Sequence, residues 1–106
     1  MTVVSQHSKV LSCTSYAIRH DASSEGFLRN WELRGSEDGK NWTTLSSHVD
    51  DKTITRAHQY GSWRAEQATC TPLSVFRIVL TGPNSSRCNP YRLSLSWFEL
   101  YGYLEV

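Results

Sequence analysis

The chain has 106 residues and a mass of 12.1 kDa, a length that fits one domain. Its 11 Lys and Arg residues stand against 10 Asp and Glu, and the resulting charge of +1 argues against general binding to nucleic-acid backbones. Hydrophobic residues make up 39% and charged residues 20%, which excludes a disordered chain. No apolar run approaches the roughly 18 residues of a membrane span, so we expect none.

The strands are predicted from short alternating runs between turn signals, because no window keeps a helical period. The first strand is expected over 13–20 and the second over 30–35, each alternating apolar and polar residues. A turn over 36–41 follows, where a glycine allows the positive φ that a hairpin favours. The return strand over 42–45 begins with Trp42, whose side chain we expect in the core.

The second half of the chain begins with a polar segment, 46–61, predicted as a long loop with one short strand near 53–55. Trp63 starts another short run. The clearest buried strand is 75–81, and its apolar residues on both faces indicate a central position in a sheet. A last aromatic run over 92–103 is expected to close the sheet. This pattern is typical of an all-β sandwich or barrel.

Three isolated cysteines, Cys13, Cys70 and Cys88, bear on the cellular compartment. Their odd number indicates reduced thiols. The first nine residues also lack the basic head and apolar stretch of a secretory signal. We therefore expect a cytoplasmic or nuclear protein.

No pattern indicates catalysis, a metal or a cofactor, so we predict a protein that is not an enzyme and binds neither. The four histidines lack metal-ligand spacing, and the six glycines are too scattered for a phosphate-binding loop. His20-Asp21, with many serines in the chain, invites a catalytic-triad interpretation. The sequence contains no nucleophile elbow to support it.

Five segments form an ordered set of motifs: Tyr16-Ala17-Ile18-Arg19-His20, Leu28-Arg29-Asn30-Trp31-Glu32-Leu33, Gly35-Ser36-Glu37-Asp38-Gly39-Lys40-Asn41-Trp42, Phe76-Arg77-Ile78-Val79-Leu80-Thr81-Gly82 and Phe98-Glu99-Leu100-Tyr101-Gly102-Tyr103. Together they resemble the discoidin domain, also called the coagulation-factor V/VIII C-type or galactose-binding-like module. The Arg-His and Leu-Arg-x-Trp pieces are most similar to its intracellular branch, found in BTB-domain and ubiquitin-ligase proteins. The resemblance implies a non-catalytic jelly-roll β-sandwich of about eight strands, with recognition loops at one end.

The sequence departs from this family at its start, where members carry further strands that close the sandwich. Here only residues 1–12 precede the first predicted strand, and we interpret them as an N-terminal extension before a discoidin-like domain over 13–106. The sandwich is thus expected to lack N-terminal strands. A fragment, a naturally shortened form and a fold completed by a second copy stay open as explanations. An incomplete sheet edge would favour self-association.

Arginine and aromatic residues near the predicted loops suggest a binding surface. Arginine outnumbers lysine eight to three, and Tyr60, Trp63 and Tyr91 lie in or beside loops. Protein interfaces and sugar-binding platforms both use such residues. Arg29, within a strand-entry motif, is expected in a structural ion pair instead. We predict a recognition module for a protein or peptide partner, in the ubiquitin-ligase or BTB adaptor setting that the resemblance implies, with these contact residues: His20, Asp21, Tyr60, Arg64, Asn89, Tyr91 and Arg92.

The alternative is a carbohydrate- or phospholipid-binding domain, as in secreted discoidin relatives. Membrane binding needs exposed apolar residues, and sugar sites in these relatives often hold calcium. Phe27-Leu28 is an adjacent apolar pair in the loops, and Asp50-Asp51 is an acidic pair in the long polar segment. A glycan therefore stays open as a partner.

Overall fold

The structure of the protein is a computed structural model that describes residues 2–65 and 73–104, with side chains over 15–65 and 73–102. The described part is all-β, as predicted. It contains six strands, fewer than the resemblance implied: β1 (Thr2–His20), β2 (Trp31–Ser36), β3 (Thr43–His48), β4 (Tyr60–Arg64), β5 (Leu73–Leu80) and β6 (Leu95–Leu104).

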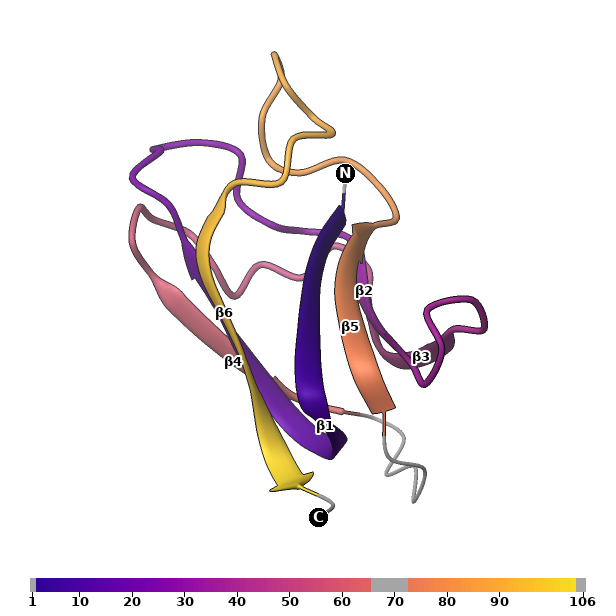
Figure 1. Ribbon diagram of the computed structural model, residues 1–106. Coiled ribbons are helices and arrows are strands. Elements are labelled where there is room, and N and C mark those ends of the chain that lie inside the picture. Colours follow the sequence, from indigo (N-terminus) through magenta and orange to yellow (C-terminus); the bar gives the residue numbers. More distant parts are fainter. Residues whose placement is uncertain (1, 66–72, 105–106) are drawn as a thin grey trace.

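The long strand β1 belongs to two antiparallel sheets. Its first residues pair with β5, from Thr2 opposite Val79 to Gln6 opposite Val75. It pairs with β6 from Leu11 onward and with β4, on its other side, from Ser15 onward. Figure 1 shows β1 running beside β5 and then turning toward β4 and β6. One sheet therefore holds β3, β2, β5 and the start of β1, and the second holds β4, the end of β1 and β6.

Residues 2–12, expected to precede the first strand, are part of β1. Where the domain begins along the chain stays a prediction. Strands β4 and β6 each pair with β1 alone in the part of the chain that the structure describes, so each offers an open edge. Self-association through such an edge also stays a prediction.

The core lies between the two sheets and confirms the predicted jelly-roll sandwich. Strand β5 is central, between β2 and β1, as its apolar faces predicted. The alternating residues of β1, β2 and β5 meet across the layers and are almost wholly buried. They include Tyr16, Ile18, Trp31, Leu33, Phe76 and Ile78, which are at most 1% exposed.

A β-bulge sets the direction of the side chains in β6. The register against β1 skips one residue of β6 between Leu95 and Trp97. Because this bulge switches parity, Leu95 and Phe98 both pack against the core. Trp97, expected to share a face with Leu95, instead points outward and is 38% exposed.

The segment expected as a long polar loop is shorter than predicted, because β3 runs to His48 and β4 begins at Tyr60. The prediction of a short strand near 53–55 is wrong, because the backbone of this stretch forms hydrogen bonds with a side chain and not with another strand. The Gln59 amide donates to the Thr53 carbonyl at 2.7 Å, and its oxygen accepts the Thr55 N–H at 2.8 Å.

Trp42 lies outside the core, contrary to the prediction. It precedes β3, and the guanidinium of Arg77 sits 3.9 Å from its ring centre. Phe76 and Ile78 point inward, so Arg77 lies on the outer face of β5. The inward residue of β3 is Leu45.

Asp38 organises the turn between β2 and β3. Its carboxylate accepts backbone N–H groups of Lys40 at 2.8 Å and Asn41 at 2.9 Å, and the Ser36 hydroxyl at 3.0 Å. These hydrogen bonds, that of the Asn41 backbone first, hold the pKa of Asp38 well below its ordinary value. Gly39 adopts the predicted left-handed conformation, with φ +76°.

We expect Asp38→Asn to lower the melting temperature at neutral pH and to flatten its fall in acid. Because the folded pKa lies below the ordinary 3.8, the carboxylate stabilises the fold above that pH. This contribution is lost as the pH falls through the folded pKa. Thermal melts from neutral pH to below 3.8 measure it, with Asp50→Asn as the matched control. Parallel acid profiles for wild type and Asp38→Asn would contradict the prediction.

Candidate functional site

Three connecting loops gather at one end of the sandwich, which we call the loop end (Figure 1). The first loop (21–30) follows β1, the second (49–59) follows β3 and the third (81–94) follows β5. The first and third loops are joined where the Ser85 N–H donates to the Phe27 carbonyl at 3.0 Å.

Arg29 ties the first loop to the second. Its guanidinium donates to the carbonyl oxygens of Ile54 at 2.7 Å and Leu28 at 3.0 Å, and lies 5.9 Å from the Phe27 ring centre. The Asp51 N–H returns a bond to the Arg29 carbonyl at 2.8 Å. The expected ion pair of Arg29 is therefore wrong within the described residues: its partners are carbonyls and a ring.

Asn84 orders the third loop from inside. Its Nδ2 donates to the carbonyls of Asn89 at 3.0 Å and Arg92 at 2.7 Å, while its Oδ1 accepts the Ser86 N–H at 2.7 Å. The residue is only 7% exposed. The loop is thus held by one buried amide, and Tyr91 beside it is 66% exposed.

A polar recess lies between the first and third loops, with about 200 Å³ of atom-free space. Arg92 and Glu25 are its charged members, and Arg92 forms no ion pair with another side chain in the described residues. A bound carboxylate, hydroxyl or amide would find hydrogen-bond partners here. The recess is lined by Ser23, Glu25, Gly26, Asn84, Ser86, Asn89, Arg92 and Ser94.

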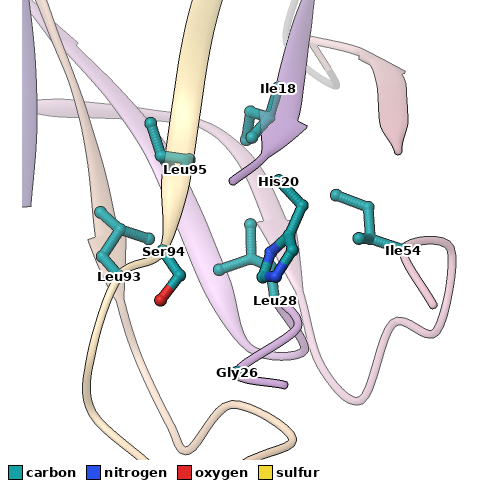
Figure 2. Close-up of a pocket in the computed structure, with 8 residues that line it drawn as sticks. All are labelled: Ile18, His20, Gly26, Leu28, Ile54, Leu93, Ser94 and Leu95. Carbon is teal, nitrogen blue, oxygen red and sulfur yellow. The ribbon is translucent and has the colours of Figure 1, made fainter. Parts of the chain in front are cut away.

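A second, largely apolar recess adjoins the first and shares Gly26 and Ser94 with it (Figure 2). It is a partly open recess with about 210 Å³ of atom-free space, solvent at its mouth included. His20, which is 2% exposed, contributes its ring, and the ring also packs against Phe27 at 4.7 Å between centroids. The apolar recess is lined by Ile18, His20, Gly26, Leu28, Ile54, Leu93, Ser94 and Leu95.

The structure brings most of the predicted contact residues together. Five of them lie at or beside the loop end with at least part of their surface accessible: Asp21, Tyr60, Asn89, Tyr91 and Arg92. His20 lies beneath this surface, in the apolar recess. Arg64 lies at the other end of β4, paired with Ser15 of β1, and does not join the group.

Trp63, expected among exposed loop aromatics, packs against the core instead, with its ring 4.9 Å from that of Trp31. The exposed partner of Tyr60 is Trp97, in an edge-on contact at 5.5 Å, and Arg19 lies 5.2 Å from the Tyr60 ring centre. The sequence did not indicate Trp97, because only the bulge in β6 turns it outward.

A Ser-His-Asp chain occurs at a place that the sequence did not suggest. The Ser46 hydroxyl lies 2.6 Å from His48 Nε2, and His48 Nδ1 lies 3.0 Å from Asp51. The pKa of Asp51 lies below its ordinary value. Burial is the largest single influence and raises this pKa, but the hydrogen bonds from Thr53 and the nearby His48 together lower it by more. Ser46 is 1% exposed and also bonds to Tyr16, so its hydroxyl is not accessible to a substrate.

The triad interpretation of His20 and Asp21 is not supported by their geometry. His20 Nε2 is 3.7 Å from Asp21 Oδ1 but 2.9 Å from the Ser23 carbonyl, which is its hydrogen-bond partner. Asp21 Oδ1 in turn accepts the Ser23 N–H at 2.8 Å. The pair closes the first turn of the loop.

Cys88 is an exposed free thiol, while the side chains of Cys13 and Cys70 lie outside the described residues. Within the described part, no three His, Cys, Asp or Glu side chains gather as a metal site would require. The same part contains no helix of the length and apolarity needed to cross a membrane.

Three relatives share sequence with most of this chain. A BTB/POZ domain-containing protein of Arabidopsis thaliana is 43% identical over 94 residues, covering 88% of this chain and 12% of that protein. The E3 ubiquitin-protein ligases Ufd4 of Drosophila melanogaster and hecd-1 of Caenorhabditis elegans are 44% and 40% identical, each over 84% of this chain and 3% of the ligase. The chain therefore spans a small part of each relative.

A solved structure confirms the fold. The F5/8 type C domain of a Bacteroides fragilis protein superposes with a TM-score of 0.64 at 16% identity, covering 95% of this chain and 64% of that one. No protein-family model matches the chain. The fold is that of the discoidin domain, and the similar sequences are a BTB protein and two ubiquitin ligases, as the resemblance implied.

Proposed function

We propose that this discoidin-fold domain is a non-catalytic recognition module that binds a peptide segment of a protein partner at its loop end. The observation that carries the proposal is the pair of adjoining recesses, one polar and one apolar, which share Gly26 and Ser94. A peptide presents polar and apolar groups at neighbouring positions, so it matches this alternation. The setting we propose is a ubiquitin-ligase or BTB adaptor protein of the cytoplasm or nucleus, after the relatives.

The loops are held in place by hydrogen bonds, and this rigidity supports binding because a rigid site loses little conformational entropy when a ligand docks. Arg29 fixes the first and second loops, and Asn84 fixes the third. Tyr91 and Arg92 protrude from this frame, and both residue types are enriched among interface residues that dominate binding energy.

Each of the two features that suggested lipid or calcium-dependent sugar binding has one residue engaged within the fold. Leu28 of the Phe27-Leu28 pair is 6% exposed and belongs to the core. Asp51 lies 3.0 Å from His48, while Asp50 is exposed and lies 3.6 Å from an equally exposed Lys52. These contacts favour a peptide over a membrane surface or a calcium-bound sugar.

The proposal is tested with peptides selected on the wild-type domain from a random phage-displayed library. We expect Tyr91→Ala and Arg92→Ala each to weaken the selected peptides about tenfold, the effect of losing one strong interface contact. Isothermal titration calorimetry measures the change.

Arg64→Ala is the matched control, because it removes an exposed arginine at the other end of β4 and should leave the affinity unchanged. Selected peptides that bind the Tyr91 and Arg92 variants as tightly as wild type would refute the loop-end site. A glycan array that bound where peptides failed would support the sugar-binding alternative.

A further inference from the structure

One ring nitrogen of His20 has an unused hydrogen-bonding capacity inside the fold. Nε2 lies 2.9 Å from the carbonyl oxygen of Ser23. A carbonyl only accepts, so Nε2 must carry the proton in the neutral imidazole. Nδ1 is then a bare acceptor, and no hydrogen bond reaches it from any described residue.

The His20 ring is part of the wall of the apolar recess (Figure 2). Among described side chains, Arg77 Nε is the one nitrogen or oxygen that is both wholly covered and without a partner. His20 Nδ1 also lacks a partner, so it is not wholly covered, and the space that it faces is the recess. A side chain that is 98% buried thus points an unsatisfied acceptor into a cavity.

The size and lining of the recess restrict what can occupy it. Its covered part has room for about one group of the size of a water molecule, so a larger ligand must extend through the open side of the recess. Its other side chains are almost all aliphatic, so an ammonium group would lose its hydration without gaining the three acceptors that it needs. A neutral donor on a short apolar stem fits both conditions.

We infer that the apolar recess receives an aliphatic hydroxyl, which donates to His20 Nδ1 while its carbon stem contacts Ile54 and Leu95. In a bound peptide this group is the side chain of serine or threonine, so the inference rests on the proposed function. Gly26 and Ser94, at the boundary of the two recesses, would then lie beneath the peptide backbone.

The test uses ethanol as the probe and acetone as its matched control, since both are small and only ethanol donates a hydrogen bond. Nitrogen-15 NMR of the histidine ring follows Nδ1 during each titration. We expect a saturable shift of the His20 Nδ1 resonance with ethanol and none with acetone. Equal responses to the two probes, or no saturable response because the recess takes water only, would overturn the inference.

His20→Gln removes the Nδ1 acceptor and keeps the hydrogen bond to the Ser23 carbonyl. The glutamine amide nitrogen stands the same number of bonds from Cα as His Nε2, so it still donates to the Ser23 carbonyl, but nothing replaces Nδ1. We expect the ethanol-induced methyl shifts of Ile54 and Leu95 to vanish in this variant, and their survival would count against the inference.

If His20→Gln fails to fold, the comparison of ethanol with acetone in the wild type still decides the matter. Both titrations are independent of any partner. A negative result with ethanol therefore leaves peptide binding at Tyr91 and Arg92 intact. A failure of the peptide experiment, in contrast, would not alter the response to ethanol.

Discussion

Trp31→Ala is expected to destabilise the domain by about 3–5 kcal/mol, the usual cost of removing a large aromatic side chain from a core. Trp31 is 0% exposed and stacks on His48 with 4.1 Å between ring centroids. Its Nε1 donates to the Tyr16 hydroxyl at 3.1 Å. This bond begins a series of side-chain hydrogen bonds that continues from Tyr16 to Ser46 and from Ser46 to His48. Since domains are stable by about 5–15 kcal/mol, this loss removes a large share of the free energy of unfolding.

Urea denaturation followed by fluorescence measures this loss, and Trp42→Ala is its matched control. Trp42 is a tryptophan outside the core, covered by Arg77, so its removal forfeits a cation–π contact of about 0.5–2 kcal/mol. We expect the midpoint to fall much further for Trp31→Ala than for Trp42→Ala. Similar midpoints for both variants would show that the core is not centred on Trp31.

A subtler variant, Trp31→Phe, separates packing from hydrogen bonding at the same position. It keeps an aromatic ring against His48 but removes the indole donor, so the Tyr16 hydroxyl loses one hydrogen bond. The Tyr16 hydroxyl keeps Ser46 as a partner, so the lost hydrogen bond should cost about 0.5–1.5 kcal/mol, and the total should fall below that of Trp31→Ala.

The alternation of apolar and polar residues predicted which side chains point inward wherever a strand contains no bulge. Tyr16 and Ile18 on β1, like Trp31 and Leu33 on β2, are buried as their spacing indicated. The same spacing continues from Ile18 to His20, so the burial of this histidine could have been predicted. Its assignment to the surface came from its place at the end of a strand instead of its parity.

The features that could not be predicted depend on contacts between distant segments. The bulge that turns Trp97 outward is a shift in the register between two strands: His20 of β1 pairs with Leu95 of β6, while Arg19 pairs with Trp97. The turn of β1 from one sheet into the other likewise follows from its different partners along its length. A period in a single sequence carries no information on such register shifts.

The candidate site was predicted at the level of loops but not of its internal order. Exposed aromatic and arginine residues placed recognition near Tyr91 and Arg92. What makes these loops a site is the bonding of Arg29 and Asn84 to backbone carbonyls. Polar side chains in loops have no characteristic spacing. The sequence therefore could not distinguish a side-chain amide that binds the loop backbone from one that is solvated.

Asn84→Ala is expected to open the third loop and to weaken loop-end peptides more than the loss of a single contact residue. The substitution removes the partner of the Arg92 carbonyl and of the Ser86 N–H, and it leaves the Asn89 carbonyl with only the Arg92 N–H at 3.3 Å. Each buried group left unsatisfied costs about 1–3 kcal/mol, so the loop relaxes toward solvent, where water can replace these bonds.

Amide hydrogen exchange at Ser86 and calorimetry with the selected peptides measure the two effects of Asn84→Ala. Asn41→Ala is the matched control, because Asn41 is exposed in the turn between β2 and β3 and its side chain donates only to Asp38. Unchanged protection at Ser86 would show that Asn84 does not hold the loop. If protection falls while peptide affinity is kept, the recesses are not the binding site, because Asn84 forms part of the wall of the polar one.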